Sequence, residues 1–294
     1  MQYRSWKAAS FVIGHLPARA AYALAALIGV AGYYCWPRGR RAMLRNFRHV
    51  LPHAAPAEIR RVARASLVNY CRYLADFIQF HRFTARDLVD ICHGEPAFAG
   101  LDAVLERGKG AIIVCMHFGN WDVGAGAAAA RGYPLTVIAE TFADPRLDAM
   151  VVGARRRLGM NVVAMERAAP SIFRALKANG LLALLIDRPV SGDGVTVEFF
   201  GRPIDVPAGA ARIALRTGAA VVPVAFARQH PTRRDVSVFA DFSVSPERTG
   251  DDREDIRRLT QAIVHAHERF IRAHPEQWYK FQEMWPRIPA TASA

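Results

Sequence analysis

The chain has 294 residues, of which 52% are hydrophobic and 22% are charged. It shows no internal repeat, low-complexity tract or long Pro/Gly/Ser linker, which excludes a repeat array and leaves one large domain, with or without an added lobe. The formal charge of +13, from 39 Lys and Arg against 26 Asp and Glu, favours an anionic partner. Nucleic-acid binding would need aromatic residues interleaved on a basic face, and no such pattern is present.

The amino-terminal segment is apolar and then strongly basic. Residues 20–37 carry no charged side chain, and Tyr33, Tyr34 and Trp36 lie together before an arginine-rich run over residues 38–48. Such a stretch is at the lower edge of the roughly 20 residues that a membrane span needs. Three arrangements fit it: a helix lying in the cytoplasmic leaflet, which we favour, a single span, or a buried helix without lipid contact.

No convincing cleavage site for a signal peptide follows this segment. We therefore predict a membrane-associating helical segment over residues 1–50 and an α/β domain over residues 51–289. The expected location is the cytoplasmic face of the inner or plasma membrane, as a peripheral or monotopic protein on an anionic surface.

The rest of the chain alternates between helical and strand patterns. After a helix over residues 57–83, whose last aromatic residues are candidates for a lipid pocket, this alternation predicts a mostly parallel central sheet flanked by helices. The expected strands are 111–116, 135–140, 161–165, 181–187, 195–200, 221–226 and an antiparallel 236–242. The expected helices after the first are 121–131, 144–158, 170–178, 208–217 and 252–273.

The most informative motif follows the first of these strands. His117 comes directly after the apolar run 111–116, Gly119 allows a turn, Asn120 is a candidate helix cap, and Asp122 lies one turn further on. We expect Asp122 to accept a hydrogen bond from one ring nitrogen of His117, which leaves the other nitrogen free as a general base.

Further candidates lie near other strand ends, where ligands bind in open parallel sheets. Glu140 and Asp187 each end a strand, and Arg188 follows the second. One or more of Arg155, Arg156 and Arg157, if they face the cleft, are candidates to clamp a phosphate. The pair Phe199 and Phe200 precedes a glycine, and we expect it to form a hydrophobic wall of the substrate groove.

The four cysteines, Cys35, Cys71, Cys92 and Cys115, form no CxxC pair and have no metal-ligand spacing with a histidine. We expect reduced thiols, no metal site and no cofactor. Cys115 lies two residues before His117, but its place in an apolar strand favours a core residue over a nucleophile.

Together these residues resemble the lysophospholipid-acyltransferase-like superfamily, in its bacterial glycolipid branch of lipid A lauroyl and myristoyl acyltransferases and phosphatidylinositol mannoside acyltransferases. The resemblance covers nearly the whole chain in order. Its marks are a histidine, four residues and an acid at His117 to Asp122, then Arg45-Asn46-Phe47, Glu140, Arg155, Asp187, Phe199-Phe200-Gly201, Pro207-Ala208-Gly209, residues 274–278 and Trp285. Arg188 and the ending over residues 278–285 look closer to the mannoside enzymes.

The resemblance implies transfer of a fatty acyl chain from a thioester, acyl-CoA or acyl carrier protein, to a sugar hydroxyl of a membrane glycolipid. His117 would be the base and Asp122 its support, while Glu140 and Arg155 would line the cleft. Asp187 would have a supporting role, and we count it and Arg188 with the substrate-binding residues. Two alternatives stay open: an inactive lipid-binding or membrane-tethering protein, and a thioesterase that uses water as the acceptor.

Overall fold

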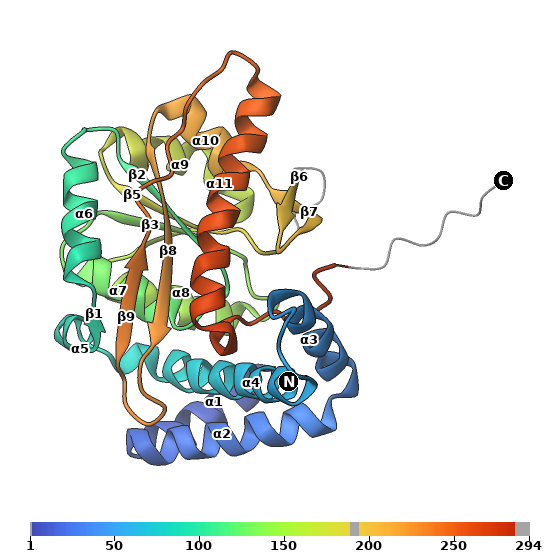
Figure 1. The fold of residues 1–294 in the computed structure, drawn as a ribbon. Helices are drawn as coiled ribbons and strands as arrows, with labels where there is room; N and C mark the ends of the chain where they lie inside the picture. Colours follow the sequence, from blue (N-terminus) through green and yellow to red (C-terminus); the bar gives the residue numbers. More distant parts are fainter. Residues whose placement is uncertain (1, 189–193, 286–294) are drawn as a thin grey trace.

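The computed structural model describes residues 2–188 and 194–285 and has a central sheet of seven strands (Figure 1). The strand order is β1-β9-β8-β2-β5-β3-β4; every neighbouring pair is parallel except β8 and β9. The strands are β1 (Cys92–His93), β2 (Ala111–Cys115), β3 (Leu135–Ala139), β4 (Asn161–Ala164), β5 (Leu181–Leu185), β8 (Ala220–Arg228) and β9 (Val236–Ala240). The mostly parallel sheet and its antiparallel β9 confirm the predictions.

Helices surround this sheet and form a separate layer at one end of the molecule (Figure 1). The amino-terminal helices are α1 (Gln2–His15), α2 (Ala18–Cys35), α3 (Pro37–Val50) and α4 (Pro56–Gln79). The remaining helices are α5 (Ala85–Ile91), α6 (Glu95–Leu105), α7 (Trp121–Ala130), α8 (Pro145–Arg157), α9 (Ala168–Lys177), α10 (Gly209–Thr217) and α11 (Asp252–Ala273). Most agree with the sequence-based bounds to within a few residues, whereas α5 and α6 were not predicted.

Alternate residues of each strand contribute to two different clusters, because successive side chains point to opposite faces of a sheet. Ile112 and Val114 of β2 pack in a cluster with α10 and α11, whereas Ile113 and Cys115 belong to a second cluster with α7. All five residues of β2 are buried, as predicted for a strand covered on both faces. The strand that leads to His117 is therefore fixed from both sides.

One strand assignment needs a correction. The predicted strand over 195–200 exists as β6 (Gly194–Phe199), but it does not join the central sheet. It pairs antiparallel with β7 (Arg202–Pro207), a strand that was not predicted, in a separate hairpin. The turn between them contains Phe200 and Gly201, both at positive φ. The tight turn reverses the direction of the chain after β6. The backbone hydrogen bonds of β6 are therefore made with β7.

The amino-terminal helices pack on α4, and α2 runs alongside it on the outside of the molecule (Figure 1). The buried stripe of α2 includes Ala21, Ala25 and Gly29, and a Cβ on Gly29 would lie 2.7 Å from the Cα of Val68. The opposite face exposes Leu27 and Ile28, among others. Within the described residues, α2 is the one helix long and apolar enough to cross a membrane, and 28% of it is buried.

Candidate active site

The turn after β2 has the predicted shape. Gly119 adopts φ +60°, and a Cβ at this position would lie 1.7 Å from the carbonyl oxygen of Phe226. Asn120 caps α7 because its side chain accepts from the backbone N–H of Val123 at 3.3 Å. The backbone N–H of Asn120 donates to the Phe226 carbonyl at 2.8 Å. This close contact with β8 fixes the turn that carries His117.

Asp187, which follows β5, is the carboxylate partner of His117. Its Oδ1 lies 2.6 Å from His117 Nδ1, and its Oδ2 accepts from the backbone N–H of His117 at 3.0 Å. The two residues meet because β2 and β5 are parallel neighbours and end side by side. Burial opposes the charge on Asp187, but the charge and hydrogen bonds of His117 outweigh it and lower the pKa of Asp187 to about 2.

An ionised carboxylate only accepts hydrogen bonds, so Nδ1 of His117 carries the hydrogen. This leaves the Nε2 lone pair free to take a proton. The His117 side chain is 13% exposed and borders the cavity described below, so this nitrogen can be reached from the cavity. The geometry of a general base is therefore present, with Asp187 as the orienting group.

The expectation that Asp122 orients His117 is wrong in this structure. Asp122 Oδ1 instead pairs with Arg155, 2.9 Å from Nε and 2.8 Å from Nη2, and its Oδ2 accepts from the Tyr73 hydroxyl at 2.8 Å. The Asp122 side chain is 3% exposed. Because α7 turns away from β2 after its cap, Asp122 faces α4 and α8 and joins them by a buried ion pair.

Aromatic rings and the carboxyl-terminal segment complete the surroundings of His117. Trp121 packs edge-on against the imidazole, with ring centroids 5.1 Å apart, and stacks on Tyr73 at 4.0 Å. The Tyr279 backbone N–H donates to the His117 carbonyl, and Lys280 Nζ donates to the Asp187 carbonyl, both at 2.8 Å. This strand-like segment therefore holds both members of the pair.

The structure also explains one of the motifs that carried the resemblance. Asn46 on α3 is 1% exposed, and its amide donates to the backbone carbonyls of Lys280 and Gln282. Its side-chain oxygen accepts from the backbone N–H of Met284 at 2.9 Å. Asn46 thus holds the segment that contacts His117 and Asp187.

A cavity of about 440 Å³ opens at His117, in the range of about 300–1,000 Å³ usual for ligand sites. Its polar rim comprises His117, Asp122, Glu140, Arg155 and Arg188. Its walls are apolar and come from one face of the sheet and from α4, α6 and α7. They include Leu74, Phe77, Phe98, Leu101, Ile113, Cys115, Ala125, Ala128, Val137, Leu181, Ala183, Val222, Val224 and Phe242.

Of the predicted substrate-binding residues, Glu140 and Arg188 lie at the cavity rim and pair with each other at 2.9 Å. Both side chains are more than half exposed, so this ion pair is open to a ligand. Arg155 also borders the cavity, although its Nε and Nη2 are used by Asp122. Among the aromatic residues at the end of the first predicted helix, Phe77 lines the cavity, whereas Phe80 and Phe83 are core residues.

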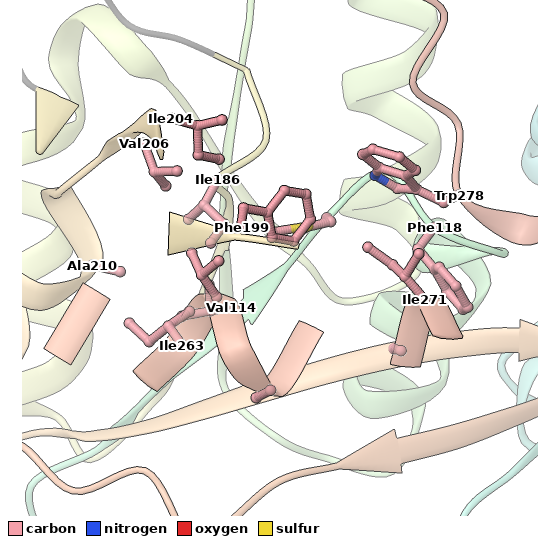
Figure 2. Close-up of a cluster of buried hydrophobic side chains, with 14 of the residues drawn as sticks. Val114, Phe118, Ile186, Phe199, Ile204, Val206, Ala210, Ile263, Ile271 and Trp278 are labelled. Carbon is pink, nitrogen blue, oxygen red and sulfur yellow. The ribbon is translucent and has the colours of Figure 1, made fainter. Parts of the chain in front are cut away.

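The predicted wall of Phe199 and Phe200 is a misassignment. Neither residue lines the cavity; Phe199 is fully buried in the cluster on the opposite face of the sheet, together with Val114, Ile186 and Trp278 (Figure 2). Phe200 packs against that cluster. The hairpin of β6 and β7 carries these rings away from β5 and toward α11.

Three residues near the site were missed by sequence reasoning: Tyr73, Lys280 and Tyr279. Tyr73 lies in a helical stripe that looks like ordinary core, and the other two are far from His117 in the sequence. Cys115 was correctly set aside, since burial raises the pKa of its thiol to about 12. Among residues 2–188 and 194–285, no group of three or more His, Cys, Asp or Glu is placed to hold a metal ion.

The comparison with protein families identifies the class. Residues 5–287 match the family described as bacterial lipid A biosynthesis acyltransferase, and the chain belongs to this family. Its relatives with an assigned activity include the phosphatidylinositol mannoside acyltransferases of Mycobacterium tuberculosis and Mycolicibacterium smegmatis. The first is 29% identical over 266 residues, covering 87% of this chain and 80% of the relative, and the second is 28% identical over 261 residues, covering 84% and 80%.

Proposed function

We propose that this acyltransferase moves a fatty acyl chain from a thioester donor to a sugar hydroxyl of a membrane glycolipid, with His117 as the general base. The observation that carries the proposal is the position of His117, held by Asp187 at the mouth of the apolar cavity. A base beside an apolar slot is the arrangement needed to join a hydroxyl to a fatty acyl group.

In the proposed reaction, Nε2 of His117 takes the proton of the acceptor hydroxyl as its oxygen bonds to the thioester carbon. The carbon–sulfur bond then breaks, and the leaving thiolate takes the proton from the imidazolium. The negative charge of Asp187 stabilises that imidazolium, and such base catalysis contributes about 10²–10⁴ in rate. The reaction needs neither a metal nor a cofactor, and the donor is acyl-CoA or acyl carrier protein.

Arg188 is our candidate to stabilise the negative charge that develops on the carbonyl oxygen. Its side chain is 57% exposed at the cavity rim, and its partner Glu140 is equally accessible. Arg155 is less suitable because Asp122 already uses two of its nitrogens. One well-placed donor contributes about 3–4 kcal/mol to such a step. Glu140 would be left to accept a hydrogen bond from a second sugar hydroxyl.

The face of α2 that points away from α4 supports a peripheral location at the cytoplasmic surface of the membrane. It exposes Leu27, Ile28, Val30 and Tyr34, and Phe11 and Val12 of α1 are exposed as well. A helix with one packed face and one exposed apolar face fits a position in the plane of the interface. An anionic surface would suit the net charge of +13.

The test is acyl transfer by purified protein with labelled acyl-CoA or acyl carrier protein and glycolipids extracted from bacterial membranes. His117→Ala is expected to reduce transfer by about 10²–10⁴. Because it leaves the buried Asp187 without its partner, it also lowers stability, and transfer is compared at a temperature at which both proteins are folded. The matched control is His53→Ala, at an exposed position outside the cavity lining. Full activity of His117→Ala would remove the base from the mechanism.

The same assay separates the alternatives. Release of free fatty acid without acylated glycolipid would identify a thioesterase. Binding of donor and glycolipid without turnover, in the wild-type protein, would identify an inactive lipid-binding protein. Mass spectrometry of the product would show which glycolipid and which chain length are used.

A further inference from the structure

A second cavity, of about 400 Å³, lies between α4, the segment that follows β8 and the segment just before Trp278. It shares no lining residue with the catalytic cavity. Its ionisable lining is strongly basic and contains a single carboxylate: Arg61, Arg64, Arg72, Arg228, His230 and Glu276. A concave surface with this composition attracts an anion.

The charges of two of these arginines are not neutralised by a neighbour. Arg72 donates from Nη1 to the neutral side chain of Asn69 at 2.9 Å, and Arg64 lies 3.4 Å from the Tyr34 hydroxyl. Within the described part of the chain, neither of them forms an ion pair with a carboxylate. Arg61 lies 3.5 Å from Glu58, but both side chains are at least half exposed, so this pair is weak.

Arg72 also has a donor that is not used. Its Nε is buried and has no hydrogen-bond partner in the described structure. Burial and the nearby charge of Arg228 lower the pKa of Arg72. A buried donor without a partner costs free energy, and an oxygen-rich anion in the cavity would offset the repulsion between the arginines.

Arg228 makes the inner wall of this cavity rigid. It pairs with the buried carboxylate of Asp76, which also accepts from Asn120 at 2.9 Å and from the Tyr22 hydroxyl of α2. The charge of Arg228 is therefore used inside the protein. Arg64 and Arg72 remain as the cations available to a ligand.

The cavity adjoins the exposed apolar face of α2. Val68 lines the cavity, and its Cα is so close to Gly29 of α2 that no side chain would fit between them. Gly29 is on the packed side of α2, whereas Leu27, Ile28 and Val30 are exposed on its other side. Tyr34 is exposed as well and is the partner of Arg64, so the exposed side of α2 meets the cavity at Tyr34. A basic cavity and an apolar helix face thus lie side by side, in the same way as the phosphate and acyl regions of a phospholipid.

We propose that this cavity binds the phosphate group of an anionic phospholipid of the bilayer and thereby seats α2 on the membrane surface. Arg64 and Arg72 hold the phosphate oxygens, and the acyl chains of the lipid lie along the exposed face of α2. The bound lipid is a docking ligand and is not the acyl acceptor. The proposal concerns binding alone, so its test does not depend on acyl transfer.

The experiment compares binding of the full chain to phosphatidylcholine vesicles with and without phosphatidylglycerol. The double variant Arg64→Gln/Arg72→Gln is expected to bind the anionic vesicles about tenfold or more weakly than wild type, because each basic residue at such a surface contributes about a factor of five. The matched control is Arg253→Gln/Arg258→Gln, which removes the same charge from exposed positions near the start of α11, remote from α4 (Figure 1). This control is expected to change binding by less than about twofold.

A second experiment, with a water-soluble phospholipid, distinguishes binding of a lipid from binding of free phosphate. Dihexanoyl phosphatidylglycerol, below its micellar concentration, is expected to bind wild type and to slow amide hydrogen exchange over residues 64–72 and 229–230, whereas inorganic phosphate binds much more weakly. This experiment uses the wild-type protein, so it stands even where the double variant fails to fold. Equal losses in both double variants, or inorganic phosphate binding as tightly as the lipid, would overturn the proposal.

Discussion

The two faces of the central sheet are packed in opposite ways. On the face under α10 and α11, large side chains such as Phe199 and Trp278 are fully buried in one cluster (Figure 2). On the other face, α7 presents Gly124, Ala125 and Ala128, and a cavity of about 440 Å³ remains. The difference shows that binding space is made by small residues on one covering helix, while the opposite face provides the stability that such a cavity costs.

The packed face is expected to show the largest effect on stability. Phe199→Ala removes a fully buried ring that stacks on Trp285, and it should lower the free energy of unfolding by about 3–5 kcal/mol. Denaturant unfolding measures this. If the two faces have separate roles, the residual folded enzyme keeps the chain-length preference of wild type. A changed preference would show that the faces are coupled.

A substitution of Asp122 tests whether part of the cavity rim serves stability and takes no part in the reaction. Asp122→Asn leaves Arg155, whose side chain is 12% exposed, without its anionic partner, and we expect a loss of about 3 kcal/mol in unfolding free energy. Thermal unfolding and denaturant titration measure this loss of unfolding free energy. Unchanged stability together with a large loss of rate would instead restore Asp122 to a role in the reaction.

Asp187→Asn is expected to lower the rate of transfer as well as the stability. Asparagine at this position no longer fixes the hydrogen on Nδ1 of His117 or stabilises the imidazolium, so kcat should fall by about 10²-fold or more. KM should change little, because the cavity walls are untouched. Steady-state kinetics with one donor and saturating acceptor decide this, and equal kcat in both proteins would contradict the assignment.

Ala128→Leu should reduce the space on the cavity face. The added side chain occupies the acyl slot beside α7, and we expect the preference for the longest accepted chain over a shorter one to fall by about tenfold. The ratio of kcat/KM values for a series of acyl donors measures the shift. Phe199→Ala serves as the comparison on the packed face.

A further expected effect is on acid stability. The pKa of Asp187 is lowered to about 2, so its ion pair stabilises the fold above about pH 4, and this contribution is lost as the pH falls from 4 through 2. The contribution is about 2 kcal/mol for such a shift. Unfolding free energies of wild type and Asp187→Asn should therefore converge below pH 2 and differ above pH 4. Parallel curves across this range would show that folding does not lower the pKa of Asp187.

Several elements around the site could be predicted from local patterns in the sequence. The continuous apolar run over residues 111–116 predicts β2, Gly119 predicts the turn, and Asn120 predicts the start of α7. The apolar stretch with few charges likewise predicted that α2 is a helix with an apolar surface. Each of these depends on residues within a few positions of one another.

Only the tertiary structure decided which carboxylate meets His117. Asp122 is nearer in sequence, but the cap turns α7 away, and the neighbouring strand brings Asp187 from 70 residues further along the chain. The same holds for Phe199, which the hairpin of β6 and β7 carries to the packed face, and for Lys280 beside Asp187. The order of strands in a sheet depends on packing among many side chains that are far apart in the sequence. No local sequence pattern contains that information.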